Sequence, residues 1–303
     1  MLVAAVVAAM TSFVWRRNKS LGTGVVTAAT LLAAAAAFAQ DDLVRRGEYL
    51  TAAGGCISCH TMDVAGAVPL AGGRKLETPF GTFISPNITP DKATGIGDWS
   101  EEDFLRALWE GESPDGEVYF PAFPYTAYTG ASREDLLAIK AYLFSLSPVS
   151  QSNLEHDLSW YVSTRLAASA WQMLNFEPGR FEPDAAQSDE WNRGAYLVRH
   201  LGHCGECHTP RSSTGVLQAD REMAGSVLGE EKIPNITPHP DAGIGRWSKS
   251  DIEYFLDAGM LPDGDFAGSS MGDVIDDNTS RLSREDRLAI AAYLMSLPAM
   301  ADD

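Results

Sequence analysis

The chain has 303 residues, of which 45% are hydrophobic and 21% charged, the composition of an ordinary globular protein with room for about two domains. Its 41 acidic residues outnumber its 23 basic residues and give a formal net charge of −18. So acidic a chain is not expected to bind nucleic acid or anionic lipid. The charge favours a partner with a basic docking surface, and solubility alone is the competing explanation.

Residues 1–39 have the pattern of an export signal. An apolar run is followed by a basic cluster at residues 16–19 and then by an alanine-rich run that ends in Ala-Phe-Ala at residues 37–39. Cleavage after Ala39 would leave 20 basic against 41 acidic residues, a net charge of −21. The alternative is that residues 21–39 stay as an anchor in the inner membrane, although alanine makes a poor membrane span. Both interpretations predict export to the periplasm.

A helix is predicted over residues 44–53, directly before a Cys-x-x-Cys-His motif at residues 56–60. This motif is the attachment signature of c-type haem, in which Cys56 and Cys59 bond to the porphyrin and His60 becomes an axial ligand of the iron. One alternative is a redox-active cysteine pair, which does not require the histidine. Another is a zinc site made by all four cysteines of the chain, which would leave the histidines unused.

The same motif recurs 148 residues later, with Cys204 and Cys207 as the thiols and His208 as the iron ligand. The offset of 148 also aligns Asn-Ile-Thr-Pro at residues 87–90 with the same four residues at 235–238. We therefore predict two copies of one module, each holding one covalently bound haem c.

The helices of each copy are predicted from glycine, serine and aspartate positions. The first helix of each copy contains Gly-x-Tyr, at Gly47 and Tyr49 and at Gly194 and Tyr196, and a residue as small as glycine would let another helix cross closely. Two later helices in each copy are predicted to start at serines that are followed three residues later by aspartate, a capping-box-like arrangement. These serines are Ser100, Ser132, Ser248 and Ser283, and the aspartates are Asp103, Asp135, Asp251 and Asp286.

Two segments without a regular pattern complete the copies. The Gly/Pro-rich stretch at residues 79–97 is expected to wrap the haem edge. Residues 148–190 are predicted to be an ordered linker with a helix, because an apolar stripe is flanked there by aromatic residues, and we expect it to pack on both modules. The stripe is Leu158, Val162, Leu166, Ala170 and Met173, with Trp160, Tyr161 and Trp171 beside it. The predicted fold is all-α, with cytochrome c-type domains at 40–147 and 191–303.

The sixth ligand of the iron differs between the copies. In the second copy, Met271 lies between the middle and last helices, where a distal methionine is expected, and Met260 and Met223 are the alternatives. The equivalent residue in the first copy is Phe123, which cannot bind iron. The iron of the first haem is then five-coordinate, water-bound or ligated from a distance. The side chains weighed for this are Met62, expected on the proximal side, His156 in the linker, and Tyr119, Tyr125 and Tyr128.

These motifs together resemble the cytochrome c subunit of membrane-bound quinoprotein or flavoprotein alcohol dehydrogenases. The resemblance covers residues 42–300 and rests on Arg165, Trp171, the Gly-Arg-Phe at 179–181, the runs at 191–197 and 202–211, and the two repeated loop motifs. It implies electron transfer from a dehydrogenase to ubiquinone or an oxidase. That family usually carries three haem modules, whereas this chain shows two.

Two functions follow from the sequence. The favoured one is a periplasmic electron carrier, not an enzyme by itself, that takes electrons from an exported dehydrogenase and passes them to an oxidase, a quinone-linked complex or another cytochrome. The alternative is a haem enzyme or gas-binding protein that uses an open first haem, for example a peroxidase. Peroxide chemistry needs a distal acid-base group, and only Glu117 and tyrosines occur in sequence near Phe123.

Overall fold

The computed structural model of the chain describes residues 38–229 and 231–301, leaving out the side chain of Ser269. The chain divides into two compact units, the second of which begins at Arg46 and contains both Cys-x-x-Cys-His motifs. The export signal or anchor predicted for residues 1–39 lies outside the described residues except at its last two positions. Among the described helices, none is long and apolar enough to cross a membrane.

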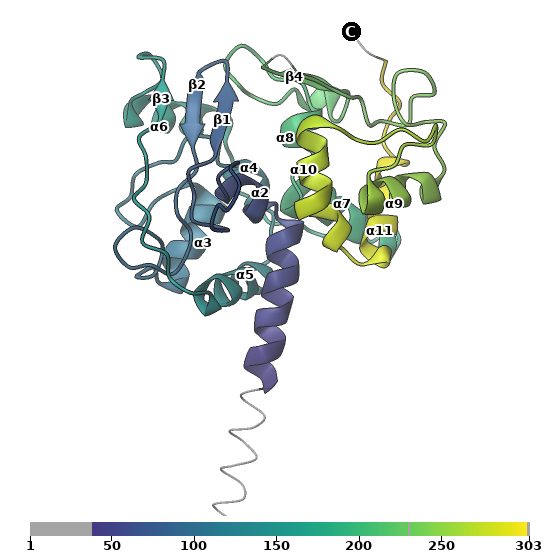
Figure 1. Ribbon diagram of the computed structural model, residues 1–303. Helices are drawn as coiled ribbons and strands as arrows, with labels where there is room; N and C mark the ends of the chain where they lie inside the picture. Colours follow the sequence, from purple (N-terminus) through teal and green to yellow (C-terminus); the bar gives the residue numbers. More distant parts are fainter. Residues whose placement is uncertain (1–37, 230, 302–303) are drawn as a thin grey trace, which may run out of the picture. The chain divides into compact units, whose positions relative to one another are not determined.

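The first repeat consists of short helices with a β-hairpin beside them (Figure 1). Its elements are a helix whose described part covers residues 38–53, α2 (Cys56–His60), β1 (Lys75–Thr78), β2 (Gly81–Ile84), α3 (Glu101–Glu110), α4 (Tyr125–Tyr128) and α5 (Arg133–Ser145). The segment that joins the repeats contributes β3 (Asp157–Leu158) and α6 (Arg165–Asn175).

The second repeat follows the same order with small differences in length. Its elements are α7 (Asp189–Tyr196), which continues as the π-helix η1 (Leu197–Leu201), then α8 (Gly205–His208), the 3₁₀ turn η2 (Ala219–Arg221), β4 (Ser226–Leu228), β5 (Glu231–Ile233), α9 (Lys249–Ala258), α10 (Ser269–Asp277), the 3₁₀ turn η3 (Thr279–Arg281) and α11 (Arg284–Leu294).

The prediction of an all-α fold is wrong in one respect, because short strands accompany the helices. In the described residues, β1, β2 and β3 form an antiparallel sheet and β4 pairs with β5. Gly81 permits the β2–β3 pairing, since a Cβ atom there would lie 2.4 Å from the carbonyl oxygen of Asp157. Strands of two to four residues are too short to show an alternating pattern, which is why they were not predicted.

All four predicted helix starts are confirmed. In each, the serine side chain accepts a hydrogen bond from the backbone N–H of the aspartate three residues later. At Ser100 and Ser248 the aspartate returns a bond to the serine N–H and completes the capping box. At the last helix of each repeat, the carboxylates of Asp135 and Asp286 instead bind arginine and tyrosine side chains from other helices.

The close helix crossings predicted at the two Gly-x-Tyr sequences are also confirmed. A Cβ atom on Gly47 would lie 1.9 Å from the carbonyl oxygen of Ala138 in α5, and one on Gly194 would lie 2.0 Å from that of Ala289 in α11. Real Cβ atoms do not come so near a backbone oxygen, so only glycine allows the first and last helices of each repeat to cross at these points.

The repeats share one hydrophobic core. Its buried residues come from both copies and include Leu50, Leu108, Ile139 and Leu143 of the first and Leu197, Ile252, Ile290 and Leu294 of the second. Because the repeats pack as one compact unit, their division into domains at 40–147 and 191–303 stays a prediction.

The joining segment contacts both repeats, as expected. The indole N–H of Trp171 donates to the carbonyl oxygen of Thr214 in the second repeat at 2.8 Å. The amide of Gln172 donates to the carbonyl oxygen of Glu110 in the first repeat at 2.7 Å. These bonds from adjacent residues of α6 tie the segment to both copies.

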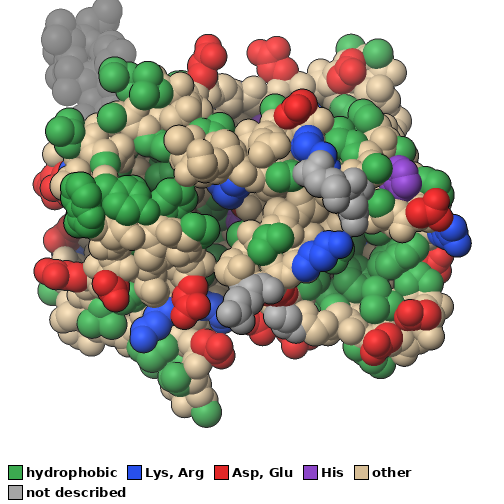
Figure 2. Space-filling model, turned by 90° about the horizontal axis from the view of Figure 1, so that it is seen from above, with side chains coloured by type: hydrophobic (Ala, Val, Ile, Leu, Met, Phe, Trp, Pro, Cys, Tyr) green, Lys and Arg blue, Asp and Glu red, His purple; other side chains and the backbone are tan. Residues whose placement is uncertain are grey.

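The expectation that the apolar stripe of this segment packs on the repeats as one helical face is wrong in two respects. Leu158 lies in β3 and the helix begins only at Arg165. Leu166 and Met173 of the stripe are each 79% exposed, and Trp160 beside the stripe is 86% exposed, whereas the buried residue of α6 is Ala168. The helix therefore packs through its small side chains and leaves an apolar face in solvent. Figure 2 shows exposed hydrophobic side chains among polar and charged ones on the face of the molecule that it draws.

We expect Gly47→Ala and Gly194→Ala to lower the free energy of unfolding by at least about 1 to 3 kcal/mol each, because the added methyl group must push apart two packed helices. The measurement is chemical denaturation followed by circular dichroism. Gly179→Ala is the matched control, since nothing lies within 4 Å of a Cβ atom there. Equal stability of all three variants would contradict the close crossing.

Candidate haem-binding sites

The first attachment motif forms the short helix α2. Cys56, Cys59 and His60 stand at positions i, i+3 and i+4, which places their side chains on one helical face. Both cysteines are free thiols. The Nδ1 atom of His60 lies 2.8 Å from the carbonyl oxygen of Pro86, to which it donates its proton. The Nε2 atom is then unprotonated, and its free lone pair is what binds iron.

The second motif repeats this arrangement. Cys204 is the N-cap residue of α8, and Cys207 and His208 lie within the helix. The Nδ1 atom of His208 lies 2.8 Å from the carbonyl oxygen of Pro234. The two prolines are equivalent, since each directly precedes Asn-Ile-Thr-Pro. Sequence reasoning noted the four-residue repeat but missed the role of the proline before it.

The asparagine of each repeated loop anchors this proline carbonyl. Asn87 is buried and its amide donates to the carbonyl oxygen of Val149 at 2.7 Å, beyond the last helix of its repeat. Asn235 makes the same bond to the carbonyl oxygen of Met300 at 2.7 Å. The chain after each last helix therefore holds the loop that orients the histidine of the motif.

A second backbone contact fixes each motif from the opposite side. The N–H of Gly72 donates to the carbonyl oxygen of His60 at 2.7 Å, and that of Gly225 donates to the carbonyl oxygen of His208 at 2.8 Å. Gly72 has a φ of 78° and Gly225 one of 87°, a backbone conformation that favours glycine. Each histidine is thus held through its ring and through its own carbonyl.

The protonation states of both histidines suit ligation of iron. Burial lowers the pKa of His60 and of His208, and the bond to the proline carbonyl opposes this only in part, so both rings are neutral at pH 7. Burial also raises the pKa of Cys56 and of Cys204 to about 12, which keeps these thiols protonated.

The donor set fits haem better than it fits a bare metal ion. Each motif offers two thiols and one imidazole nitrogen on one face, which is what covalent attachment of a porphyrin and ligation of its iron need. No group of three or more His, Cys, Asp or Glu side chains among the described residues is clustered as a metal site. The zinc alternative therefore has no cluster to support it.

In the second repeat, Met271, the predicted distal ligand, lies in the first turn of α10 and is half-buried against the core. Its helix is held at both sides of this residue, since Ser270 donates to the carboxylate of Glu231 at 3.0 Å and Asp273 pairs with Arg74 at 2.6 Å. Met223, one of the two alternatives, is 1% exposed and belongs to the core.

The equivalent position of the first repeat is lined by aromatic rings. The ring of Phe123 lies 5.6 Å from that of Tyr119 and 5.9 Å from that of Tyr128. The hydroxyl of Tyr128 donates to the carbonyl oxygen of Gly54 at 2.6 Å, so it is already engaged. This leaves Tyr119 and Tyr125 among the tyrosines weighed from the sequence, and the hydroxyl of Tyr125 is buried without a hydrogen-bond partner among the described residues.

His156 is placed in a way that disfavours ligation. Its Nδ1 atom accepts a hydrogen bond from the backbone N–H of Ile84 at 3.1 Å, so the neutral ring carries its proton on Nε2. The ring also packs edge-on against Phe83 and Phe120. Neither nitrogen offers a free lone pair in this position.

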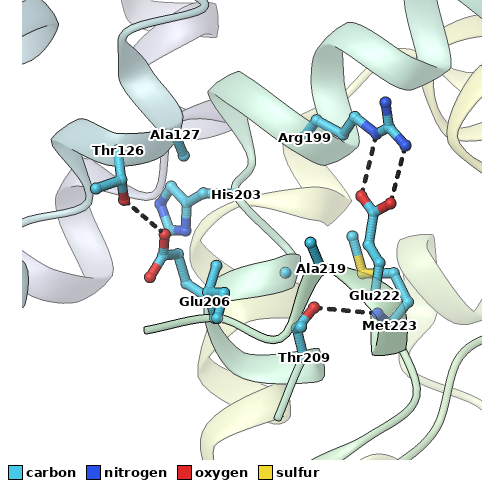
Figure 3. A pocket seen from close by; sticks show the side chains of 11 residues that line it. Thr126, Ala127, Arg199, His203, Glu206, Thr209, Ala219, Glu222 and Met223 are labelled. Carbon is cyan, nitrogen blue, oxygen red and sulfur yellow. Dashed lines mark hydrogen bonds and ion pairs between the residues drawn. The ribbon is translucent and has the colours of Figure 1, made fainter. Parts of the chain in front are cut away.

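A cavity of about 360 Å³ lies behind the second motif (Figure 3). It is lined by Arg199, which pairs with Glu222, and by Glu206, which accepts a hydrogen bond from Thr126 of the first repeat at 3.1 Å. His203 lies between the two repeats at this cavity and was not predicted from the sequence. The only signal that could have found it is its place directly before Cys204.

The attachment motifs and the helices around them define a c-type cytochrome, and comparison with known proteins agrees. The family model for cytochrome c matches residues 44–147. A diheme cytochrome c-type protein of Cereibacter sphaeroides is 45% identical over 261 residues, which cover 84% of this chain and 86% of that protein. The chain belongs to this family of dihaem c-type cytochromes, and it carries haem c and serves electron transfer.

Longer relatives include dehydrogenase subunits. The gluconate 2-dehydrogenase cytochrome c subunit of Pantoea cypripedii is 42% identical over 86% of this chain, and the alcohol dehydrogenase (quinone) cytochrome c subunit of Gluconobacter oxydans is 36% identical over 95% of it. In both cases the match covers 61% of the relative. The resemblance to dehydrogenase cytochrome c subunits is thereby confirmed.

The assignment of Met271 as an iron ligand stays a prediction, which substitution can test. We expect Met271→Ala to remove the absorption feature of sulfur-ligated ferric haem and to lower the potential of that centre, because a thioether ligand favours the ferrous state. Met260→Ala is the control. Loss of the feature in the control variant alone would show that the second distal loop is aligned wrongly.

The first haem is predicted to lack a strong distal ligand, because Phe123 replaces the methionine. The ferric protein should show a high-spin component from about half of its haem, and added carbon monoxide or cyanide should bind at that centre. Phe123→Met should convert the component towards low-spin haem and raise its potential. Two fully low-spin haems in the unchanged protein would show that another side chain reaches the iron, with Tyr119 the first to test.

Proposed function

We propose that the chain holds two covalently bound haem c groups and relays electrons in the periplasm from an exported dehydrogenase to a respiratory acceptor. Cys56, Cys59 and His60 hold one haem, and Cys204, Cys207 and His208 hold the other, with Met271 as sixth ligand of the second iron. The observation that carries the proposal is the pair of histidines whose Nδ1 atoms are held at 2.8 Å by equivalent proline carbonyls.

The protein's own part in this function is to orient, insulate and tune. The haem iron supplies the one-electron chemistry by changing between ferrous and ferric states. The proline carbonyls fix the tautomer and orientation of each histidine and raise its basicity as a ligand. The thioether of Met271 favours the ferrous state and raises the potential at the second site. Neither histidine changes its protonation in this scheme, so electrons move without a proton.

Electron carriage fits the first site better than peroxidase chemistry. A peroxidase needs a distal group that accepts and returns a proton. Phe123 is surrounded by Tyr119 and Tyr128, and the carboxylate of Glu117 is paired with Arg165 at 3.3 Å. The residues around this position thus offer apolar rings and an already paired carboxylate, which suits a redox centre that is insulated from water.

The donor proposed here is an exported dehydrogenase, supported by relatives that are named as dehydrogenase cytochrome c subunits. The chain spans 61% of the length of those relatives, so their substrates and complexes do not pass directly to it. The acceptor is an oxidase, a quinone-linked complex or another cytochrome. The net charge of −18 favours a donor whose docking surface is basic.

The first test of this function is the haem count. The denatured, exported protein should carry two haems by mass spectrometry, and replacement of Cys56 and Cys59 by serine should remove one of them. Replacement of Cys204 and Cys207 by serine is the matched variant and should remove the other. A single haem in the unchanged protein, or bound zinc, would contradict the proposal.

The second test concerns the acidic surface. Reduction by the native dehydrogenase should slow by about tenfold or more between low and high ionic strength, because salt screens the attraction between opposite charges that speeds encounter. The measurement is the second-order rate of haem reduction by stopped flow. A rate that does not depend on salt would show that charge attraction plays no part in the docking of the two proteins.

A further inference from the structure

Tyr49 of the first repeat binds the start of the last helix of the second repeat. Its hydroxyl donates to Asp286 Oδ2 at 2.6 Å and accepts a hydrogen bond from the backbone N–H of Ser283 at 3.1 Å. The same carboxylate receives two bonds from Arg193, at 2.8 and 2.6 Å. A tyrosine of one repeat thus completes the helix cap of the other.

The reverse contact exists at the equivalent residues. The hydroxyl of Tyr196 donates to Asp135 Oδ2 at 2.7 Å and accepts from the backbone N–H of Ser132 at 3.2 Å. Arg46 binds the same carboxylate at 2.6 Å. Each repeat therefore makes the same tyrosine contacts with the other, through equivalent residues. This is the pattern of a two-fold symmetric dimer interface, here formed within one chain.

Both carboxylates are buried, so these contacts lie in the interior of the protein. Asp135 is 4% exposed and Asp286 is 9% exposed. Desolvation opposes the ionisation of Asp286, but the bonds from Arg193 and Tyr49 outweigh it and lower the pKa of this carboxyl. A buried carboxylate that loses one of its hydrogen-bond donors is left partly unpaired. The loss therefore favours a movement of the helices that lets water reach the carboxylate.

The pseudo-two-fold axis passes between the two attachment motifs. Gly54 and Gly202 occupy equivalent positions two residues before the first cysteine of each motif. A Cβ atom on Gly54 would lie 3.7 Å from Leu201 of the second repeat, and one on Gly202 would lie 3.6 Å from the carbonyl oxygen of Ala53 in the first. The chain segments that enter the two motifs therefore lie next to each other.

His203 extends this contact to the residue next to Cys204. Its Nε2 atom lies 3.4 Å from the carbonyl oxygen of Gly54, the same oxygen that accepts from Tyr128 at 2.6 Å. The rings of Tyr128 and His203 meet edge-on at 5.4 Å. One residue, Gly55, separates Gly54 from Cys56, so the two motifs are joined through one carbonyl group.

A further pair of contacts reaches the motifs themselves. The amide of Asn278, at the end of α10, donates to the hydroxyl of Ser58 at 3.3 Å. The hydroxyl of Thr126, in α4, donates to the carboxylate of Glu206 at 3.1 Å (Figure 3). Ser58 and Glu206 are equivalent, since each precedes the second cysteine of its motif. The equivalent helices α4 and α10 thus each bind the attachment motif of the other repeat.

We propose that Tyr49 and Tyr196 are positioning residues that clamp the two attachment motifs at one fixed separation and angle, and that this sets the electronic coupling between the two haems. The inference deepens the proposed function and rests on it. The aspartates at the helix caps are the anchors of the clamp. The arginines of the same repeat hold those aspartates in place.

Two spectroscopic and redox quantities report such a coupling. The first electron to arrive makes the second less favourable, by an amount that falls as the centres move apart, so the clamp increases the separation of the two midpoint potentials. The Soret circular dichroism of two close haems is a couplet whose amplitude depends on their distance and angle. Neither quantity follows from stability alone, which makes both suitable for a positioning role.

The test uses the exported holoprotein with Tyr49→Phe and Tyr196→Phe combined, which keeps both rings and removes both hydroxyls. Tyr161→Phe is the control, since this tyrosine is 53% exposed in the joining segment. We expect the Soret couplet of the double variant to fall to half or less and its two midpoint potentials to move closer together. The control should match the unchanged protein in both measurements.

The clamp is overturned if the double variant retains two haems and shows the couplet and the potential separation of the unchanged protein. If the double variant does not accumulate, Tyr49→Phe alone is measured, and an unchanged couplet and separation in that variant also overturn the clamp. A mass with fewer than two haems in the unchanged protein overturns the proposed function and the clamp together. Two haems with altered coupling in the variant support both.

Discussion

The close crossing of the first and last helices at Gly47 and Gly194 is the constraint on which the rest of the structure depends. Because no side chain separates the backbones there, the start of each last helix is brought beside the first helix of its own repeat. The cap aspartates Asp135 and Asp286 then lie within reach of arginines from that first helix. The same first helix leads into the attachment motif, so the crossing sets where the motif begins.

Local patterns could be predicted from the sequence, whereas their use across repeats could not. The Cys-x-x-Cys-His motifs and the serine caps each depend on residues close in sequence, and the structure has the serine caps as predicted. Gly47 and Gly194 predict a close helix crossing, but their contacts with Ala138 and Ala289 join residues far apart in sequence. The partner of Tyr49 is 237 residues away, and no periodic pattern encodes so distant a hydrogen bond. The sequence predicts Asp286 as part of a capping-box-like helix start. Only the tertiary structure shows that its carboxylate instead binds Arg193 and Tyr49.

The strands and the joining helix show two further limits of prediction. Pairs of strands as short as β4 and β5 are defined by backbone bonds to each other rather than by their own residues. The apolar stripe predicted a helix that in the structure begins only at Arg165, with Leu158 in β3, and it indicated the wrong buried face, because periodicity shows that a helix is amphipathic and not what covers it. Leu166 and Met173 face solvent while Ala168 and Gln172 make the contacts.

The difference between Phe123 and Met271 would set the direction of electron transfer between the two otherwise symmetric sites. The two attachment motifs have matching proximal contacts, with proline carbonyls at the same distance from equivalent histidines, so the proximal side does not distinguish the two proposed centres. A thioether ligand at the second iron would raise its potential, and the aromatic position in the first repeat offers no such ligand. Electrons entering at the first site would then run downhill to the second. The reciprocal tyrosine contacts hold the two sites together, and one substitution in a distal loop would decide which of them donates.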